Sequence, residues 1–391
     1  MQGEREIEEV VAKMSDVTSA AFAPGLEDVV ATRTRLSNVD GTAGRLTIAG
    51  FPVEEMAGRA SFEETLYLLW NDALPDAEQL SGLKEDLAAR RALPEITTDL
   101  LASAAAERLP AMDALRMAAG TLGSRDGDDR DNALRVVAAF PTVVATYRRL
   151  SRGDEPVGPD RELSHAANYL YMLSSEVPSD ERVRALETYL NAASDHGMNA
   201  STFTARVIVS TRSDLVSAVT GAVGALKGPL HGGAPGPALD VVFEIGEAER
   251  AEPYLREKLD RDERLMGFGH RIYKTRDPRA DVLAAAAERL YAADADGDLY
   301  RLAIAVEKTA VRLLKEYKPG RNLYTNVEYY TALLLHGLGL PRELFTPTFT
   351  ASRVAGWTAH CFEQRELDRI IRPQSEYVGA QDRAWVPLSE R

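Results

Sequence analysis

The chain has one cysteine, Cys361, in 391 residues. A single thiol excludes an internal disulfide framework and any zinc site built mainly from cysteines. No apolar run approaches the roughly 20 residues that a membrane-spanning helix needs. The first 16 residues are rich in charge and contain no apolar segment typical of a secretory signal. We therefore expect a cytoplasmic protein that does not bind membranes.

Aromatic residues and lysines are also scarce. Only 7% of the residues are aromatic, and eight of the 46 basic residues are lysine. Alanine and leucine outnumber valine and isoleucine in runs, which favours helix over sheet. The formal net charge is −14 and the isoelectric point is about 5.1, which argues against a nucleic-acid partner. Any bound anion would need a local cluster of arginines.

The apolar pattern predicts an all-α, mainly helical protein with one small β-hairpin near its start. Leucines 80, 83 and 87 repeat at helical spacing, as do apolar residues from Val306 to Tyr317, before Lys318-Pro-Gly320. Residues 29–36 and 44–48 are the only segments typical of strands, and we expect a turn at residues 38–41 between them.

A chain of this length exceeds the usual limit for one hydrophobic core, which predicts two domains or one large domain with a smaller lobe. The motifs described below begin just after residue 222 and end just before residue 330. We therefore expect a large helical domain from residues 1–221 and 331–391, and a smaller domain from residues 222–330.

Two histidines in glycine-rich turns and one glutamate are the candidate catalytic residues. His231 lies in Gly228-Pro-Leu-His-Gly-Gly233, His270 follows Gly267-Phe-Gly, and Glu328 follows Asn326-Val. Glycine permits close approach of backbone and ligand, and imidazole exchanges protons near neutral pH. A helix beginning near Pro235 would favour a neutral His231, since helix N-termini disfavour the imidazolium. Two imidazoles and a carboxylate suit enolisation and carbon–carbon bond formation.

Each candidate also has a structural interpretation. A lone histidine is often part of a core. A glutamate early in a helix is often there only because its negative charge interacts favourably with the helix dipole. Four cations, Arg271, Lys274, Arg276 and Arg279, form either a solvated basic loop or an anion site. Buried arginines often hold organic acids bidentately, so Arg353 and Arg372 are either such binding residues or ordinary surface arginines. His196 could be purely structural at the end of its helix.

Ordered motifs along nearly the whole chain resemble the citrate synthases, of the short archaeal and Gram-positive type. They are Asp40-Gly-x-x-Gly-Arg-Leu46, Gly228-Pro-Leu-His-Gly-Gly-Ala234, Met266-Gly-Phe-Gly-His-Arg-Ile-Tyr273, Asp277-Pro-Arg279 and Ser352-Arg-Val-Ala-Gly-Trp-Thr-Ala-His360. The resemblance implies a two-domain helical homodimer with a mobile small domain. It implies that acetyl-CoA, oxaloacetate and water give citrate and CoA, with the CoA thioester as a substrate and with no metal or redox cofactor.

The resemblance also assigns roles to residues. It implies that His231 donates to the thioester carbonyl, that Glu328 removes the methyl proton and that His270 protonates the keto group. It implies that oxaloacetate is held by His196, Arg279 and Arg353, together with Arg372 from the other subunit. Lys274 and its neighbour Arg271 would bind the phosphates of CoA.

One departure from the family matters. The family usually has aspartate where this chain has Glu328, and the extra methylene moves the carboxylate by roughly 1 Å, a shift that can cost about a hundredfold in rate. Two alternatives therefore stay open besides citrate synthase. One is a 2-methylcitrate synthase that uses propionyl-CoA, because one methylene discriminates weakly. The other is an impaired homologue that only binds CoA or a dicarboxylate.

Overall fold

The computed structural model describes residues 22–391 except for residues 125, 233–234, 270–271, 294–296 and 322. The chain divides into two compact units, residues 1–34 and 35–391. The described part of the first unit contains one 3₁₀ turn, η1 (Pro24–Leu26). The second unit contains the sheet, the α-helices and the candidate site.

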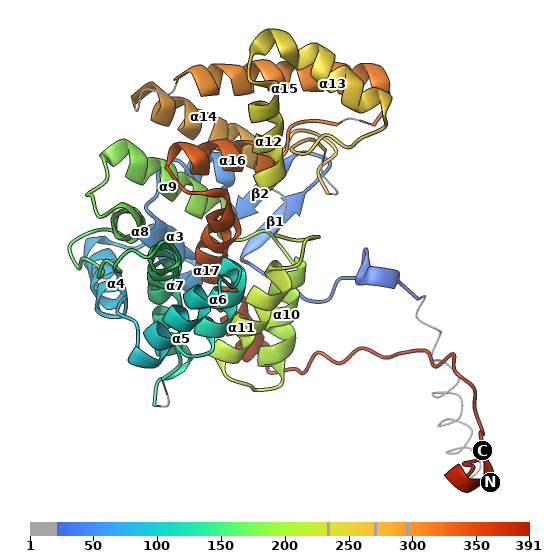
Figure 1. The fold of residues 1–391 in the computed structure, drawn as a ribbon. Helices are drawn as coiled ribbons and strands as arrows, with labels where there is room; N and C mark the ends of the chain where they lie inside the picture. The colour runs from blue at the N-terminus through green and yellow to red at the C-terminus, as the bar shows by residue number, and fades with distance from the viewer. Residues whose placement is uncertain (1–21, 125, 233–234, 270–271, 294–296, 322) are drawn as a thin grey trace. The chain divides into compact units, whose positions relative to one another are not determined.

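The second unit is mainly helical, which confirms the predicted fold class (Figure 1). Its α-helices are α2 (Val53–Met56), α3 (Phe62–Asn71), α4 (Ala77–Ala89), α5 (Glu95–Ala106), α6 (Ala111–Ala119), α7 (Asp129–Arg152), α8 (His165–Ser174), α9 (Asp180–Ala193), α10 (Ala200–Ser210), α11 (Leu215–Leu226), α12 (Pro235–Ile245), α13 (Ala251–Asp260), α14 (Pro278–Ala293), α15 (Gly297–Tyr317), α16 (Val327–Gly337) and α17 (Phe345–Leu367). Short 3₁₀ turns are η2 (Ala248–Arg250), η3 (Arg342–Leu344) and η4 (Leu388–Glu390). None of the helices in the described ranges is long and apolar enough to cross a bilayer.

The small sheet is antiparallel in the order β1 (Ser37–Asp40), β2 (Arg45–Ile48), β3 (Phe51–Pro52). The predicted second strand is confirmed, but the predicted first strand at residues 29–36 is wrong, because the hairpin begins at Ser37. Its turn lies at residues 41–44, where the Asp40 carboxylate accepts the N–H groups of Thr42 and Ala43 at 3.1 and 2.8 Å. Gly44 then takes a φ of +64°, a conformation that glycine adopts without strain.

Helix α17 forms the buried centre of the unit. It packs against α7, α9, α10 and α11, and Trp357 on it is fully buried. Figure 1 shows α12 to α16 together at one end of the unit, with α3 to α8, α10 and α11 at the other. Helix α9 contacts both α14 and α17 and so lies between these groups. The division into domains at residues 222–330 stays a prediction.

Candidate active site

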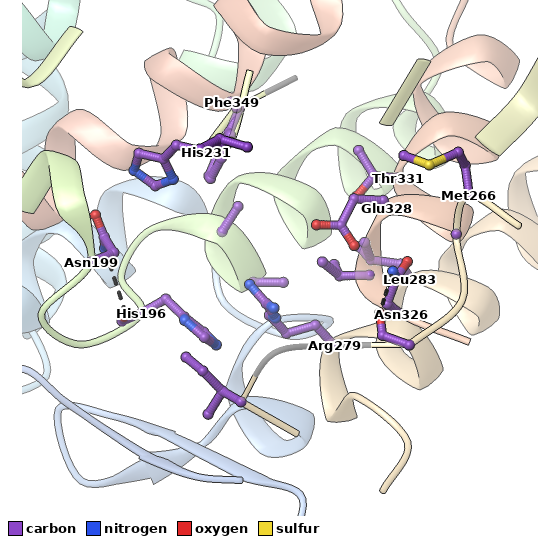
Figure 2. Close-up of a pocket in the computed structure, with 18 of the residues that line it drawn as sticks. His196, Asn199, His231, Met266, Arg279, Leu283, Asn326, Glu328, Thr331 and Phe349 are labelled. Atoms are coloured by element: carbon purple, nitrogen blue, oxygen red, sulfur yellow. Dashed lines mark hydrogen bonds between the residues drawn. The ribbon is translucent and has the colours of Figure 1, made fainter. Parts of the chain in front are cut away.

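A cavity of about 440 Å³ lies where α9, α14, α16 and α17 approach one another. Five of the predicted site residues line it, and they come from five separate parts of the chain: His196, His231, Arg279, Glu328 and Arg353. Figure 2 shows four of them, His196, His231, Arg279 and Glu328, arranged around a common space. Apolar side chains such as Leu283 and Phe349 complete the wall. The structure therefore joins two imidazoles, a carboxylate and two guanidinium groups in one hollow.

His231 lies in the loop between α11 and α12, and its ring is oriented by the start of α10. The Nε2 atom of His231 is 2.8 Å from Ser201 Oγ and 3.4 Å from Ser201 N. Trp357 Nε1 donates to the same Ser201 Oγ at 3.1 Å, which fixes the hydroxyl. The Ser201 hydroxyl also donates to Asn199 Oδ1 at 2.8 Å, so the start of α10 holds the ring of His231 in place.

The surroundings of His231 hold it neutral. Burial and the nearby positive charge of Arg353 lower its pKa from 6.5 to about 4. This lowered pKa agrees with the neutral His231 that the sequence predicted. The Ser201 N–H at the start of α10 lies 3.4 Å from the ring, and the tight loop depends on Gly232, where a Cβ would collide with the Leu226 carbonyl oxygen. A neutral imidazole keeps one N–H and can donate a hydrogen bond at pH 7.

Glu328 is the second residue of α16, and its carboxylate lines the cavity. Its Oε2 atom is enclosed and has no hydrogen-bond partner among the described residues. Burial raises the pKa of Glu328, an effect that the positive charge of Arg279 only partly offsets. A carboxylate with few partners and a raised pKa is a stronger base than a solvated one.

The Met266–Gly269 turn is fastened to the chain just before Glu328. Asn326 N donates to the Gly267 carbonyl at 3.0 Å, and Asn326 Nδ2 donates to the Gly269 carbonyl at 2.9 Å. Gly267 has a φ of +88°, and a Cβ there would come within 2.9 Å of the Tyr329 ring. Both glycines of the motif, Gly267 and Gly269, take positive φ. This backbone conformation allows the turn to pack closely against the start of α16.

Two arginines bring positive charge into the cavity. Asp277 binds Arg279 bidentately, with Arg279 Nε and Nη2 at 3.0 and 2.7 Å from its two carboxylate oxygens. Arg353 donates from Nε to the Ala193 carbonyl at 2.7 Å and lies over the Phe349 ring at 4.8 Å. Burial, together with the charge of Arg279, lowers the pKa of Arg353 to about 10. It is still charged at pH 7, so an anion that enters the cavity would relieve the repulsion between the two guanidinium groups.

His196 follows α9 and meets the segment that leads into α14. Its Nε2 atom lies 3.0 Å from the Tyr273 hydroxyl. Beneath it, Asp195 is fully buried and accepts from Ser37 Oγ at 2.5 Å, with His360 Nε2 at 3.2 Å. The position of His196 beside the cavity is therefore fixed from two sides.

Other predicted residues lie elsewhere. His270 and Arg271 fall outside the described residues. Lys274 and Arg372 are exposed and are not among the residues that line the cavity. Arg276 forms an ion pair with Glu307 at 2.7 Å, so the four predicted cations are not all available for an anion.

Sequence reasoning missed Ser201, Tyr273 and Asp277 as parts of the site. Ser201 could have been found from Asn199, which caps α10 through its side chain and so places the Ser201 N–H at a helix N-terminus near a histidine. Asp277 directly precedes Pro278 at the start of α14. Its local signal is that of a helix start, and only the fold shows that it binds Arg279.

Known proteins of one family are similar to this chain along almost its whole length. A family model described as Citrate synthase, C-terminal domain, matches residues 25–374. The chain is 42% identical over 376 residues to Citrate synthase 2 of Bacillus subtilis, covering 94% of this chain and 98% of that protein. It is 40% identical over 385 residues to the citrate synthase of Haloferax volcanii, covering 95% and 100%. It is also 37% identical over 388 residues to the 2-methylcitrate synthase of Shewanella oneidensis, covering 97% and 100%.

Solved structures give the same result for the fold. The citrate synthase of Pyrobaculum aerophilum superposes with a TM-score of 0.85 at 36% identity and covers 95% of both chains. The citrate synthase of Thermoplasma acidophilum, in a ternary complex with carboxymethyl coenzyme A and oxaloacetate, superposes with a TM-score of 0.84 at 31% identity, covering 95% of this chain and 99% of that one. The chain belongs to the citrate synthase family, transferases that make citrate from acetyl-CoA and oxaloacetate.

Proposed function

We propose that this protein is a citrate synthase of the cytoplasm, acting on acetyl-CoA, oxaloacetate and water without a metal or redox cofactor. The observation that carries the proposal is the meeting, in one cavity, of a neutral His231 and a Glu328 with a raised pKa. A thioester methyl group is a very weak acid. Its proton is removed quickly only if a base and a donor to the developing enolate act together.

Each residue has a defined task in this proposal. Glu328 takes a proton from the thioester methyl group while His231 donates a hydrogen bond to the thioester oxygen. The enol carbon then attacks the keto carbon of oxaloacetate, whose oxygen receives a proton from His270. Water finally cleaves the citryl thioester, which releases CoA and makes the reaction effectively irreversible.

Oxaloacetate would bind through His196, Arg279 and Arg353, because the two guanidinium groups offer planar pairs of donors to its carboxylates. We propose that Arg372 reaches this site from the second subunit of a homodimer. We also propose that residues 222–330 form a mobile small domain, which closes over the keto acid and excludes water.

Acetyl-CoA is too long to fit within this cavity alone, so its CoA part needs a neighbouring binding surface. A second hollow of about 510 Å³ adjoins the first and shares Arg264, Leu265, Phe268 and Gly269 with it. Its wall also carries the cation Arg321 and Lys318, whose ammonium group is ion-paired with Asp262. We propose that these groups, with Arg271 and Lys274, surround the phosphates of CoA.

A second candidate function is 2-methylcitrate synthesis from propionyl-CoA. The similarity to the 2-methylcitrate synthase of Shewanella oneidensis over 97% of the chain favours it. One additional methylene changes binding in an apolar pocket by only about 1 to 3 kcal/mol, so a preference between the two acyl groups needs a measurement.

Thiol release tests the proposal directly. The purified protein is mixed with oxaloacetate and either acetyl-CoA or propionyl-CoA, and free CoA is measured with a thiol reagent. A higher kcat/KM with acetyl-CoA supports citrate synthase, and a higher value with propionyl-CoA supports the alternative. Binding of oxaloacetate without CoA release from either thioester would leave only the impaired homologue.

The pH dependence of the rate follows from the two pKa shifts. Glu328 must be deprotonated to act as a base, and its pKa lies above the ordinary 4.5. We therefore expect kcat to fall on the acid side with a midpoint above pH 4.5. His231, with a pKa near 4, stays neutral over that range and adds no ionisation between pH 5 and 8. A pH–rate profile checks this, and a rate still maximal at pH 4.5 would contradict it.

A further inference from the structure

The turn of the β1–β2 hairpin has no part in the chemistry above, although its glycines belong to a motif of the sequence. The turn comprises Gly41, Thr42, Ala43 and Gly44. It packs against residues 272–275, a segment about 230 residues further along the chain that leads into α14. That segment borders the cavity through Ile272 and reaches Arg279 within seven residues.

The contact is made at the backbone. Lys274 N donates to the Gly41 carbonyl oxygen at 2.8 Å. A Cβ on Gly41 would collide with the carbonyl oxygen of Ile272, and a Cβ on Gly44 would collide with Thr275 Oγ1. The Gly41 contact is with rigid backbone and therefore requires the absence of a side chain, whereas the Gly44 contact is with the Thr275 side chain.

The same segment is held at two further points. The Tyr273 hydroxyl lies 3.0 Å from His196 Nε2, and Tyr273 is buried. At the other end, Arg276 donates to Glu307 Oε1 at 2.7 Å. Glu307 in turn accepts from Thr325 Oγ1 at 2.6 Å and from Tyr330 Oη at 2.5 Å, which links the segment to both sides of Glu328.

These contacts divide into two kinds. The bonds of Arg276 lie within residues 222–330, whereas those of Tyr273 and Lys274 cross to residues before 222. Only the second kind would break if the two proposed domains moved apart. The hairpin turn therefore meets the segment on the side that such a movement would open.

We propose that the Gly41–Gly44 turn is a seat for residues 272–275, and that Gly41 and Gly44 are positioning residues for the condensation reaction. The seat sets the position of Tyr273, and through it of His196, together with the entry to Arg279. This inference rests on the proposed function for its kinetic part, because it concerns how the keto-acid subsite is assembled.

Gly41→Ala is the cleanest test, because Gly41 does not take a positive φ and alanine leaves the hairpin itself unstrained. The matched control is Gly58→Ala, where a Cβ meets nothing within 4 Å and φ is also ordinary. We expect Gly41→Ala to lower kcat/KM for oxaloacetate about ten- to a hundredfold, mainly through KM, because a displacement near 1 Å has effects of this size. Gly58→Ala is expected to stay within about twofold.

The KM effect separates the seat from simple instability. Partial unfolding lowers the active fraction, and hence the apparent kcat, without changing KM. Equal KM values for oxaloacetate in Gly41→Ala and Gly58→Ala would overturn the proposal.

Hydrogen exchange gives a test that needs neither activity nor a folded variant. In the wild-type protein with oxaloacetate bound, we expect the amide of Lys274 to exchange slowly, because its N–H donates to the Gly41 carbonyl oxygen. Exchange at the rate of an unprotected peptide would overturn the seat. If the wild-type protein releases no CoA but this amide is protected, the proposed function fails and the seat stands.

Discussion

Replacing Glu328 by glutamine is expected to lower kcat by about 10²- to 10⁴-fold, the usual contribution of a general base. Glutamine keeps the length and nearly the shape of the side chain but cannot accept the methyl proton. The substitution should change the stability of the substrate-free protein little, because Glu328 Oε2 has no hydrogen-bond partner among the described residues. The thiol-release rate measures the loss, and calorimetric titration with oxaloacetate should give nearly unchanged affinity. An unchanged rate would show that the base lies elsewhere.

Glu328→Asp is the matched control, because it keeps the carboxylate charge and changes only the position of the carboxylate. Aspartate is the residue that the family resemblance leads one to expect, but here its carboxylate would lie about 1 Å further back along the side chain. We expect kcat to fall by up to about a hundredfold, because the backbone at the start of α16 is fixed by the bonds of Asn326 to Gly267 and Gly269. A faster Asp variant would instead show that Glu328 is poorly placed for the reaction.

The helical part of the fold was predictable because its signals are local. Helix α15 ends at Tyr317, directly before Lys318-Pro-Gly320, and its apolar stripe from Val306 is buried at helical spacing. The hairpin was misplaced because valines 29 and 30 have high strand propensity. Its true register depends on the Asp40 carboxylate, which closes the turn only in the folded geometry.

The site was predictable where a motif carries a special backbone. The glycines around His231 and before His270 marked close approaches, and the structure gives Gly267 and Gly269 positive φ. Ser201 has no such signal. Its role depends on contacts with His231, 30 residues away, and with Trp357, 156 residues away, and no local pattern records them.

The pKa values of His231 and Arg353 were harder to predict from the sequence than the positions of these residues. The low pKa of His231 arises from burial and from Arg353, and the low pKa of Arg353 arises from burial and from Arg279. Both depend on the meeting of α14 and α17 with the loop before α12. The sequence shows which ionisable groups are present, but their pKa values depend on how the folded chain packs around them.

Replacing His231 by alanine is expected to lower kcat by about 10²- to 10³-fold, the effect of removing one preorganised donor to a developing oxyanion. The reason is that a neutral imidazole lining the cavity can donate a hydrogen bond to the thioester oxygen as negative charge develops there. Thiol release measures the overall rate. Exchange of the thioester methyl protons with deuterated water, followed with oxaloacetate replaced by a non-reactive dicarboxylate, measures enolisation alone and should fall in parallel.

Ser201→Ala separates the orientation of that imidazole from its presence. The variant keeps the backbone N–H of Ser201 and the ring of His231 but removes the hydroxyl at 2.8 Å. One hydrogen bond contributes about 0.5 to 1.5 kcal/mol, so we expect kcat to fall only about tenfold or less, with the pKa of His231 still well below 6.5. A loss as large as that of His231→Ala would mean that the hydroxyl itself acts on the substrate. A normal enolisation rate in His231→Ala would remove His231 from the chemistry.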